Sequence, residues 1–149
     1  ADPPLLVSAT VTTNLAGAVV SFDRDTDQAG QRGSFTCALV LSDDSAARSG
    51  GANAVCYWRS ARDLYIGFGA GSSWYEGALV AIRADVIFTS GGYSLSAQGS
   101  LALRLPANPA LPTVVILGPE TVGPCDGVVL DASQSSGGGG GGFTLQWGL

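Results

Sequence analysis

The chain has 149 residues, a net charge of −5 and seven basic residues, all of them arginine. Nucleic-acid binding is not expected, because it depends on phosphate neutralisation and the sequence has no basic cluster. The absence of histidine and lysine excludes Ser-His-Asp and Cys-His nucleophile pairs, Schiff-base and phosphate-loop lysines, and zinc sites that use imidazole. Hydrophobic residues make up 46% of the chain, as in a globular protein, and no apolar run is long enough to predict a membrane span.

Two strands are predicted at the start of the chain. After an extended Pro-Pro entry, residues 6–11 alternate apolar and polar side chains. A turn around residues 14–17 leads to a second strand at residues 18–22, which has the same alternation. The apolar members of the two strands are Val7, Ala9, Val11, Ala18, Val20 and Phe22.

An acidic segment follows the second strand. Asp23, Asp25 and Asp27 have the Asp-x-Asp-x-Asp spacing that opens an EF-hand calcium loop. The rest of that pattern fails, since Gln28 stands where glycine is needed and Ser34 where glutamate is needed. A solvated loop of carboxylates is therefore the preferred interpretation. The three aspartates stay candidate metal ligands only for calcium held in another kind of inter-strand loop.

A third and a fourth strand are predicted on either side of a polar, glycine-containing crossover at residues 42–53. The third covers residues 35–41 and the fourth covers residues 54–59. Alternation places Cys37, Leu39 and Leu41 on one face of the third strand, and Cys56 and Trp58 on one face of the fourth. Trp58 is therefore interpreted as core packing rather than as part of a sugar-binding surface.

Cys37 and Cys56 are predicted to form a disulfide. Both face inward on strands separated by one crossover, and neither a Cys-x-x-Cys motif nor other soft ligands support a zinc site. The bridge would close a loop of about twenty residues and contribute about 3 kcal/mol to stability in the chain-entropy treatment. The alternative is a pair of reduced, buried thiols. Cys125 has no local partner and is expected to stay unpaired or to pair outside this sequence.

Further short strands are predicted to complete an all-β domain. Residues 64–68 alternate clearly, and residues 79–84, 86–88 and 100–105 supply the last strands. No segment has the 3.6-residue periodicity of a long helix. About six to eight strands at this spacing predict an Ig-like β-sandwich over residues 1–105. Its predicted core contains Val20, Phe22, Leu39, Ile66, Phe68, Ile82 and Leu103.

Trp74 and Tyr75 are the candidate ligand-binding residues. They follow a Gly-Ser loop, and aromatic faces can stack on sugar rings, although local packing is the alternative explanation. Carboxylate catalysis is not expected, because a glycosidase needs two acidic groups across a cleft and the only glutamates are Glu76 and Glu120. No catalytic residue and no cofactor is therefore predicted.

The C-terminal part begins after a proline-rich linker at residues 106–112, which predicts a semi-rigid spacer. Residues 113–149 are too few to bury a core by themselves. The sequence predicts a short strand at residues 128–130, a polar segment, a glycine loop at residues 137–142 and then another strand. The apolar side chains of this part include Val115, Leu117, Val129, Leu130, Phe143, Leu145 and Trp147.

This part therefore predicts the first half of a second β-sandwich. The missing strands are expected from continuation of the polypeptide beyond Leu149, which is the preferred interpretation, or from a neighbouring subunit by strand augmentation. The absence of methionine, even at position 1, also indicates a processed or excerpted product.

Two segments resemble a known family. GPETVGPCDGVVLDASQSSGGGG, followed by LQW, resembles the start of the PKD-like module that leads into the REJ (receptor for egg jelly) region of polycystin-family and related protist and algal surface proteins. The upstream LLVSATVTTNLAGAVVSFDRDTDQAG, with GSFTCALVL and AVCYW, resembles the Ig-like repeat just before that module. The Gly-Pro-Cys-Asp and Leu-Asp-Ala-Ser pairing is the more distinctive match, and the two segments together cover nearly the whole chain.

The resemblance implies a non-catalytic extracellular module of a large surface protein, ciliary or gametic as in that family. Its expected role is structure, adhesion or assembly, with protein partners or neighbouring modules. The alternative function is a carbohydrate- or calcium-binding module, for which the candidate residues are those named above.

Overall fold

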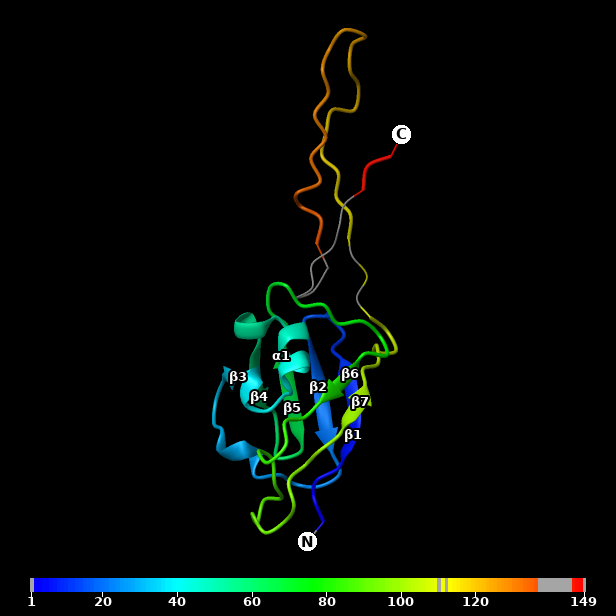
Figure 1. Cartoon of the computed structure of the whole chain (residues 1–149). Coiled ribbons are helices and arrows are strands. Elements are labelled where there is room, and N and C mark those ends of the chain that lie inside the picture. Colours follow the sequence, from blue (N-terminus) through cyan, green and yellow to red (C-terminus); the bar gives the residue numbers. More distant parts are fainter. Residues whose placement is uncertain (1, 110, 112, 137–145, 149) are drawn as a thin grey trace.

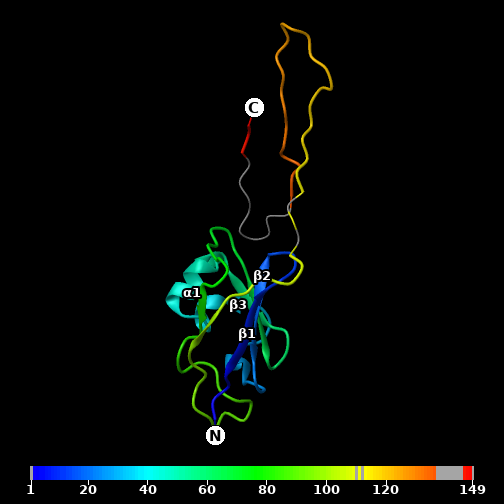
Figure 2. The ribbon, with the colours of Figure 1, turned by 90° about the vertical axis from the view of Figure 1, so that its right-hand side faces the viewer.

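The computed structural model describes residues 2–109, 111, 113–136 and 146–148. Residues 2–109, here called the body, fold into two layers, and residues 113–136, here called the arm, run out from the body as a long thin hairpin (Figures 1 and 2). The predicted glycine loop, Phe143 and Leu145 lie outside the described residues, as do two positions of the proline-rich linker.

The main sheet of the body has five antiparallel strands in the order β1-β2-β5-β4-β3. These strands are β1 (Leu6–Val11), β2 (Gly17–Phe22), β5 (Asp63–Gly67), β4 (Val55–Trp58) and β3 (Phe35–Thr36). All five come from segments that were predicted as strands, and the predicted all-β class is confirmed in its coarse form.

Period-two alternation decides which side of this sheet is buried. In β2 and β5 the alternate residues Ala18, Val20, Leu64 and Ile66 are almost completely buried. In β1 the pattern is interrupted by a register shift between Leu6 and Ser8. Val7 lies at this β-bulge and is 56% exposed, so the prediction that it shares the face of Ala9 is wrong.

The second layer covers the buried face of the sheet (Figure 1). It contains the short helix α1 (Asp43–Arg48), the 3-10 turns η2 (Cys37–Leu39) and η3 (Gly51–Asn53), and a two-stranded sheet of β6 (Leu79–Ala81) and β7 (Ser100–Ala102). One further 3-10 turn, η1 (Gln28–Gly30), lies in the loop before β3. The buried Ser45 links the layer together, because its Oγ accepts a hydrogen bond from the Ala81 amide of β6 at 2.9 Å.

The predicted third strand at residues 35–41 is largely replaced by a tight turn. Only Phe35 and Thr36 are in β3, and the amides of Val40 and Leu41 both donate to the carbonyl of Cys37. A turn changes the side-chain period, so Val40 and Leu41 point into the core while Leu39 is 48% exposed. The prediction of Leu39 as a core residue is therefore wrong.

The crossover at residues 42–53 contains α1, which the sequence prediction missed. Ser42 caps this helix by accepting a hydrogen bond from the Ser45 amide, and Asp43 and Asp44 occupy its first turn. The residue at the other end, Arg48, pairs with Asp44 across one turn. The helix is too short for a periodic pattern, so only its cap and its charges could have revealed it.

Four other predicted strands are shorter than expected or absent. The segments 79–84 and 100–105 contain only the three-residue strands β6 and β7. Residues 86–88 form no strand, although Ile87 is fully buried and its carbonyl accepts from the Ala97 amide. In the arm, residues 128–130 also form no regular strand.

The core lies between the main sheet and the second layer. Among the predicted core residues, Val20, Phe22, Ile66, Ile82 and Leu103 are buried, as expected. Phe68 is only partly buried but packs against the same cluster. The core also contains Val40, Leu41, Val80 and Ile87. These residues come from segments in which the predicted strands are shortened or absent.

Candidate functional site

Cys37 and Cys56 are joined in a disulfide at the edge of the main sheet. Their Cα atoms are 5.0 Å apart and both residues are fully buried. Cys56 lies in β4 and pairs with Phe35, whereas Cys37 opens the turn η2 directly after β3, so the bridge ties this turn to β4. Cys125 is exposed in the arm and is not bonded to either of them. Trp58 packs against the core, with its ring centroid 5.9 Å from that of Phe22.

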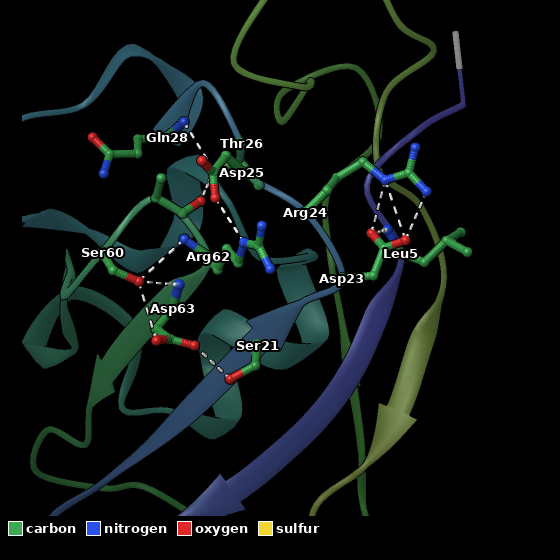
Figure 3. A network of polar contacts seen from close by, with 11 residues as sticks. Leu5, Ser21, Asp23, Arg24, Asp25, Thr26, Gln28, Ser60, Arg62 and Asp63 are labelled. Carbon is green, nitrogen blue, oxygen red and sulfur yellow. Dashed lines mark hydrogen bonds and ion pairs between the residues drawn. The ribbon is translucent and has the colours of Figure 1, made fainter.

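The acidic segment is held by contacts within the protein (Figure 3). Asp23 pairs with Arg24 at 2.8 Å and Asp25 pairs with Arg62 at 2.7 Å. The side-chain hydrogen bond from Arg24 is the main cause that lowers the pKa of Asp23 to about 2. The carboxylates of Asp23 and Asp25 are therefore already occupied in ion pairs with arginine.

The third aspartate of the segment, Asp27, is used differently. Its Oδ1 accepts hydrogen bonds from the amides of Ala29 and Phe88, each at 3.0 Å, and thereby joins two loops. Within the part of the chain that the structure describes, no three His, Cys, Asp or Glu side chains gather as a metal site would require. The contacts of Asp23, Asp25 and Asp27 therefore support the interpretation as a structural loop.

Trp74 and Tyr75 do not form a shared aromatic surface. The indole N–H of Trp74 donates to Ser49 Oγ at 3.0 Å, and the ring packs partly against the core. Tyr75 is 60% exposed, and the guanidinium of Arg48 lies 5.5 Å from its ring centroid. One ring is thus used for packing and the other stands alone at the surface.

A hollow opens beside the part of β4 that β3 does not cover. Strand β3 begins at Phe35, which pairs with Cys56, so Tyr57 and Trp58 have no strand partner on that side. Residues 28–34, which lead into β3, lie away from β4 here and border an open space of about 570 Å³. The residues that line it are Gln28, Gln31, Arg32, Gly33, Ser34, Tyr57 and Trp58.

Two tyrosines form an aromatic surface beside this hollow, on the outer face of the main sheet. Tyr57 and Tyr65 are directly opposite each other in β4 and β5, with ring centroids 4.7 Å apart. The guanidinium of Arg59 lies 4.8 Å from the Tyr65 ring centroid. This grouping depends on strand register, so sequence analysis singled out neither tyrosine.

A signal for these tyrosines was nevertheless present in the sequence. In β4 and β5 the residues Tyr57 and Tyr65 occupy the positions that alternate with buried Cys56, Leu64 and Ile66. Polar residues are usual at such outward positions, and two aromatic rings there suggest a surface with a role. Residues 28–34, which border the hollow, show no comparable pattern in the sequence.

Comparisons of the chain with models of known families, with curated proteins and with solved structures found no match. The family resemblance therefore stays a hypothesis, which rests on the Gly-Pro-Cys-Asp and Leu-Asp-Ala-Ser motifs and on the upstream strand pattern. Within the described residues, no helix is long and apolar enough to cross a membrane.

Proposed function

We propose that this chain is a non-catalytic, extracellular module of a cell-surface protein, serving structure, adhesion or assembly. The observation that carries the proposal is the arm, a narrow hairpin with many exposed apolar side chains. The disulfide of the body is consistent with an oxidising compartment. The proposed parent is a REJ-related surface protein, ciliary or gametic as in the family that the sequence resembles.

The arm has few internal contacts along its length. Its two sides meet in isolated bridges, Thr113 with Ser136 and Leu117 with Asp131. Between them, Ser135 Oγ accepts a hydrogen bond from the Val115 amide at 3.0 Å and donates one to the Val115 carbonyl at 3.3 Å. A two-stranded ribbon of this kind is marginally stable in water.

The apolar side chains of the arm are mostly left in solvent. Val129 is 81% exposed, Val114 is 64% exposed, and five others are about half exposed. Those five are Ile116, Leu117, Val122, Val128 and Leu130. Such a surface is characteristic of an interaction site, and unpaired strand edges invite pairing with further strands. We propose that the arm is completed into a β module by strands of the same polypeptide or of a neighbouring subunit.

The finer fold assignment is part of the same proposal. Residues 1–105 are proposed to be an Ig-like unit, residues 106–112 a linker, and residues 113–149 the N-terminal half of a PKD-like unit. The Gly-Pro-Cys-Asp motif forms a hydrogen-bonded turn in the arm, in which the Asp126 amide donates to the Gly123 carbonyl at 3.1 Å. The Asp126 carboxylate accepts in return from the Gly123 amide at 3.1 Å. These bonds give the motif a structural reason for its residue types.

The test uses the whole chain, purified without reductant. We expect concentration-dependent self-association in light scattering, or selective proteolysis between residues 106 and 136 while the body stays intact. Val129→Asp should weaken the self-association. Leu95→Asp is the matched control, because Leu95 is 72% exposed but lies on the body. A monodisperse monomer with a protease-resistant arm and a stable Cys125 thiol would contradict the proposal.

A carbohydrate-binding role is the second candidate function. It is favoured by the hollow at β4 and by the tyrosines beside it, not by the Trp74 and Tyr75 loop. Calcium binding by Asp23, Asp25 and Asp27 has less support, because each carboxylate already has protein partners.

A further inference from the structure

The hollow at the edge of β4 has the size of a small-ligand site, and its lining is mostly polar with two aromatic residues. Its volume of about 570 Å³ lies within the range of about 300–1,000 Å³ that is usual for such sites. It exists because residues 28–34, which lead into β3, are not paired with β4, whereas Phe35 and Thr36 are. The space is open at the surface and is therefore accessible without movement of the core.

The polar groups that line the hollow are suited to hydroxyl and carboxylate groups. Gln28 and Gln31 each carry an amide that can both donate and accept, and Ser34 carries a hydroxyl. Arg32 is exposed and forms no ion pair with any residue that the structure describes, whereas Arg24, Arg48, Arg62 and Arg83 are each paired with an aspartate. Among the described residues that line the hollow, Arg32 is the only charged one, in a chain of net charge −5.

The aromatic side of the hollow offers a flat surface. Tyr57 lines it, is 36% exposed and has the Tyr65 ring beside it at 4.7 Å between centroids. Tyr65 is itself supported by the backbone of Gly17, since a Cβ atom at that position would lie 2.7 Å from Tyr65 Cζ. The fixed Tyr65 ring limits the movement of the Tyr57 ring beside it, so Tyr57 loses little freedom when a ligand covers it.

The loop that encloses the hollow is fixed in an unusual backbone conformation. Gln28 and Ala29 have φ angles of 55° and 53°, which are rare for residues other than glycine. The Gln28 amide donates to Thr26 Oγ1 at 3.1 Å and the Ala29 amide donates to Asp27 Oδ1 at 3.0 Å. Such strained positions cluster at binding sites, where surrounding contacts hold them.

The indole of Trp58 gives a second indication. Trp58 lines the hollow, and its Nε1–H is buried without a hydrogen-bond partner among the described residues. A buried donor without an acceptor is uncommon and costs about 1–3 kcal/mol. An unsatisfied donor on a residue that borders the hollow is consistent with a partner missing at this site.

From these observations we infer that the hollow binds one acidic sugar residue of a glycan. The sugar ring packs against Tyr57, its hydroxyls bond to the two glutamine amides and Ser34, and its carboxylate pairs with Arg32. A single guanidinium fits one negative charge, whereas a polyanion such as nucleic acid would need several. The inference does not depend on the proposed role of the arm, because every residue involved belongs to the body.

The experiment is a titration of the ¹⁵N-labelled whole chain with methyl β-D-glucuronide, observed by NMR, with methyl β-D-glucoside as the matched neutral sugar. We expect millimolar affinity for the glucuronide, as is usual for a monosaccharide of this size, and at least about threefold weaker binding of the glucoside. The amides of residues 28–34 and 57–58 and the Trp58 indole should shift. No shift with either sugar, or shifts confined to Trp74 and Tyr75, would overturn the inference.

Two variants separate the parts of the inference. Arg32→Gln should make the two sugars bind equally, and Tyr57→Ala should weaken both about tenfold or more. Arg104→Gln and Tyr75→Ala are the controls, because both residues are exposed and lie outside the hollow. The amide spectrum of each variant establishes that it is folded. If Arg32→Gln still binds the glucuronide more tightly than the glucoside, the contact between Arg32 and the sugar carboxylate is excluded. If Tyr57→Ala binds both sugars as tightly as the unchanged chain does, the site itself is excluded.

Discussion

The ring of Tyr65 lies against the backbone of Gly17 on the outer face of the main sheet. A Cβ atom at position 17 would lie 2.6 Å from Tyr65 Oη and 2.7 Å from Tyr65 Cζ. Both distances are shorter than any normal van der Waals contact between these atoms. The Ile66 carbonyl oxygen is also only 2.5 Å from that position, so Gly17 is required both by the backbone of β5 and by the tyrosine that supports the proposed sugar-binding surface.

Gly17→Ala is therefore expected to destabilise the body by about 1–3 kcal/mol through overpacking. It should also displace the Tyr65 ring, which changes the near-ultraviolet circular dichroism. Gly91→Ala is the matched control, since a Cβ there would meet only the Tyr93 side chain, at 3.7 Å. Urea unfolding of both variants gives the comparison. Equal stability of the two would show that the sheet relaxes around the added methyl.

Ser49→Ala is expected to destabilise the body by about 1–3 kcal/mol. Ser49 is fully buried, and its hydroxyl donates to the Ser45 carbonyl at 2.8 Å while accepting from the Trp74 indole at 3.0 Å. Removal of the hydroxyl leaves the indole N–H without its acceptor. A double-mutant cycle with Trp74→Phe isolates this bond. Additive losses in the two single variants would mean that the bond contributes nothing.

Loss of the disulfide is expected to lower the free energy of unfolding by about 3 kcal/mol. The bridge closes a loop with a sequence separation of 19 residues and lies in the core. The double variant Cys37→Ala with Cys56→Ala, compared with the chain before and after reduction, measures this effect. Cys125→Ala is the control, because Cys125 is exposed and lies outside the bridge. Mass spectrometry that finds Cys37 and Cys56 as free thiols in the unreduced chain would contradict the pairing.

Stability should fall as the pH is lowered from about 4 towards 2, in part because Asp23 becomes protonated. Its pKa is lowered from 3.8 to about 2 in the folded chain, chiefly by the hydrogen bond from Arg24 and then by the Leu5 amide. A carboxyl group with a lowered pKa stabilises the fold above its unfolded pKa, and this contribution is lost as the pH falls through the folded pKa. Asp23→Asn should flatten the pH dependence of stability in this window.

The same ion pair can be tested from its other side. Arg24→Gln keeps the Asp23 carboxyl group but removes the main cause of its low pKa, so the pKa should rise towards 3.8. The ¹³C shift of the Asp23 carboxyl group, followed from pH 5 to 1.5, reports the value directly. An unchanged pKa in Arg24→Gln would show that Arg24 is not the cause.

Short-range patterns in the sequence predicted the strands of the main sheet and the cysteine pair. Alternation in residues 6–11, 18–22, 54–59 and 64–68 was sufficient, because in a half-buried strand each second side chain must leave water. The same rule failed at Val7, where a β-bulge shifts the register, and at Leu39, where the chain turns after Cys37 and the side-chain period changes. Local alternation does not reveal where a strand ends.

The candidate site could not be predicted in the same way. Trp74 and Tyr75 were selected because they are adjacent aromatic residues in a loop, but Ser49 lies close enough to accept from one of them. The residues that line the hollow come from two segments about thirty positions apart, and each looks unremarkable alone. Their proximity follows from the β3–β4 register, which is a long-range property.

By itself, the sequence determined a β fold, because the alternation of apolar and polar residues can be read within each short segment. It also excluded chemistry that needs histidine or lysine, because composition is counted residue by residue. The tertiary structure alone decided that Tyr57 meets Tyr65, that Gly17 makes room for the Tyr65 ring, and that the pairing of β3 with β4 begins only at Phe35. Each of these depends on which strands are neighbours and in which register. Register is fixed by burial of the whole inner face at once, so no short stretch of sequence contains it.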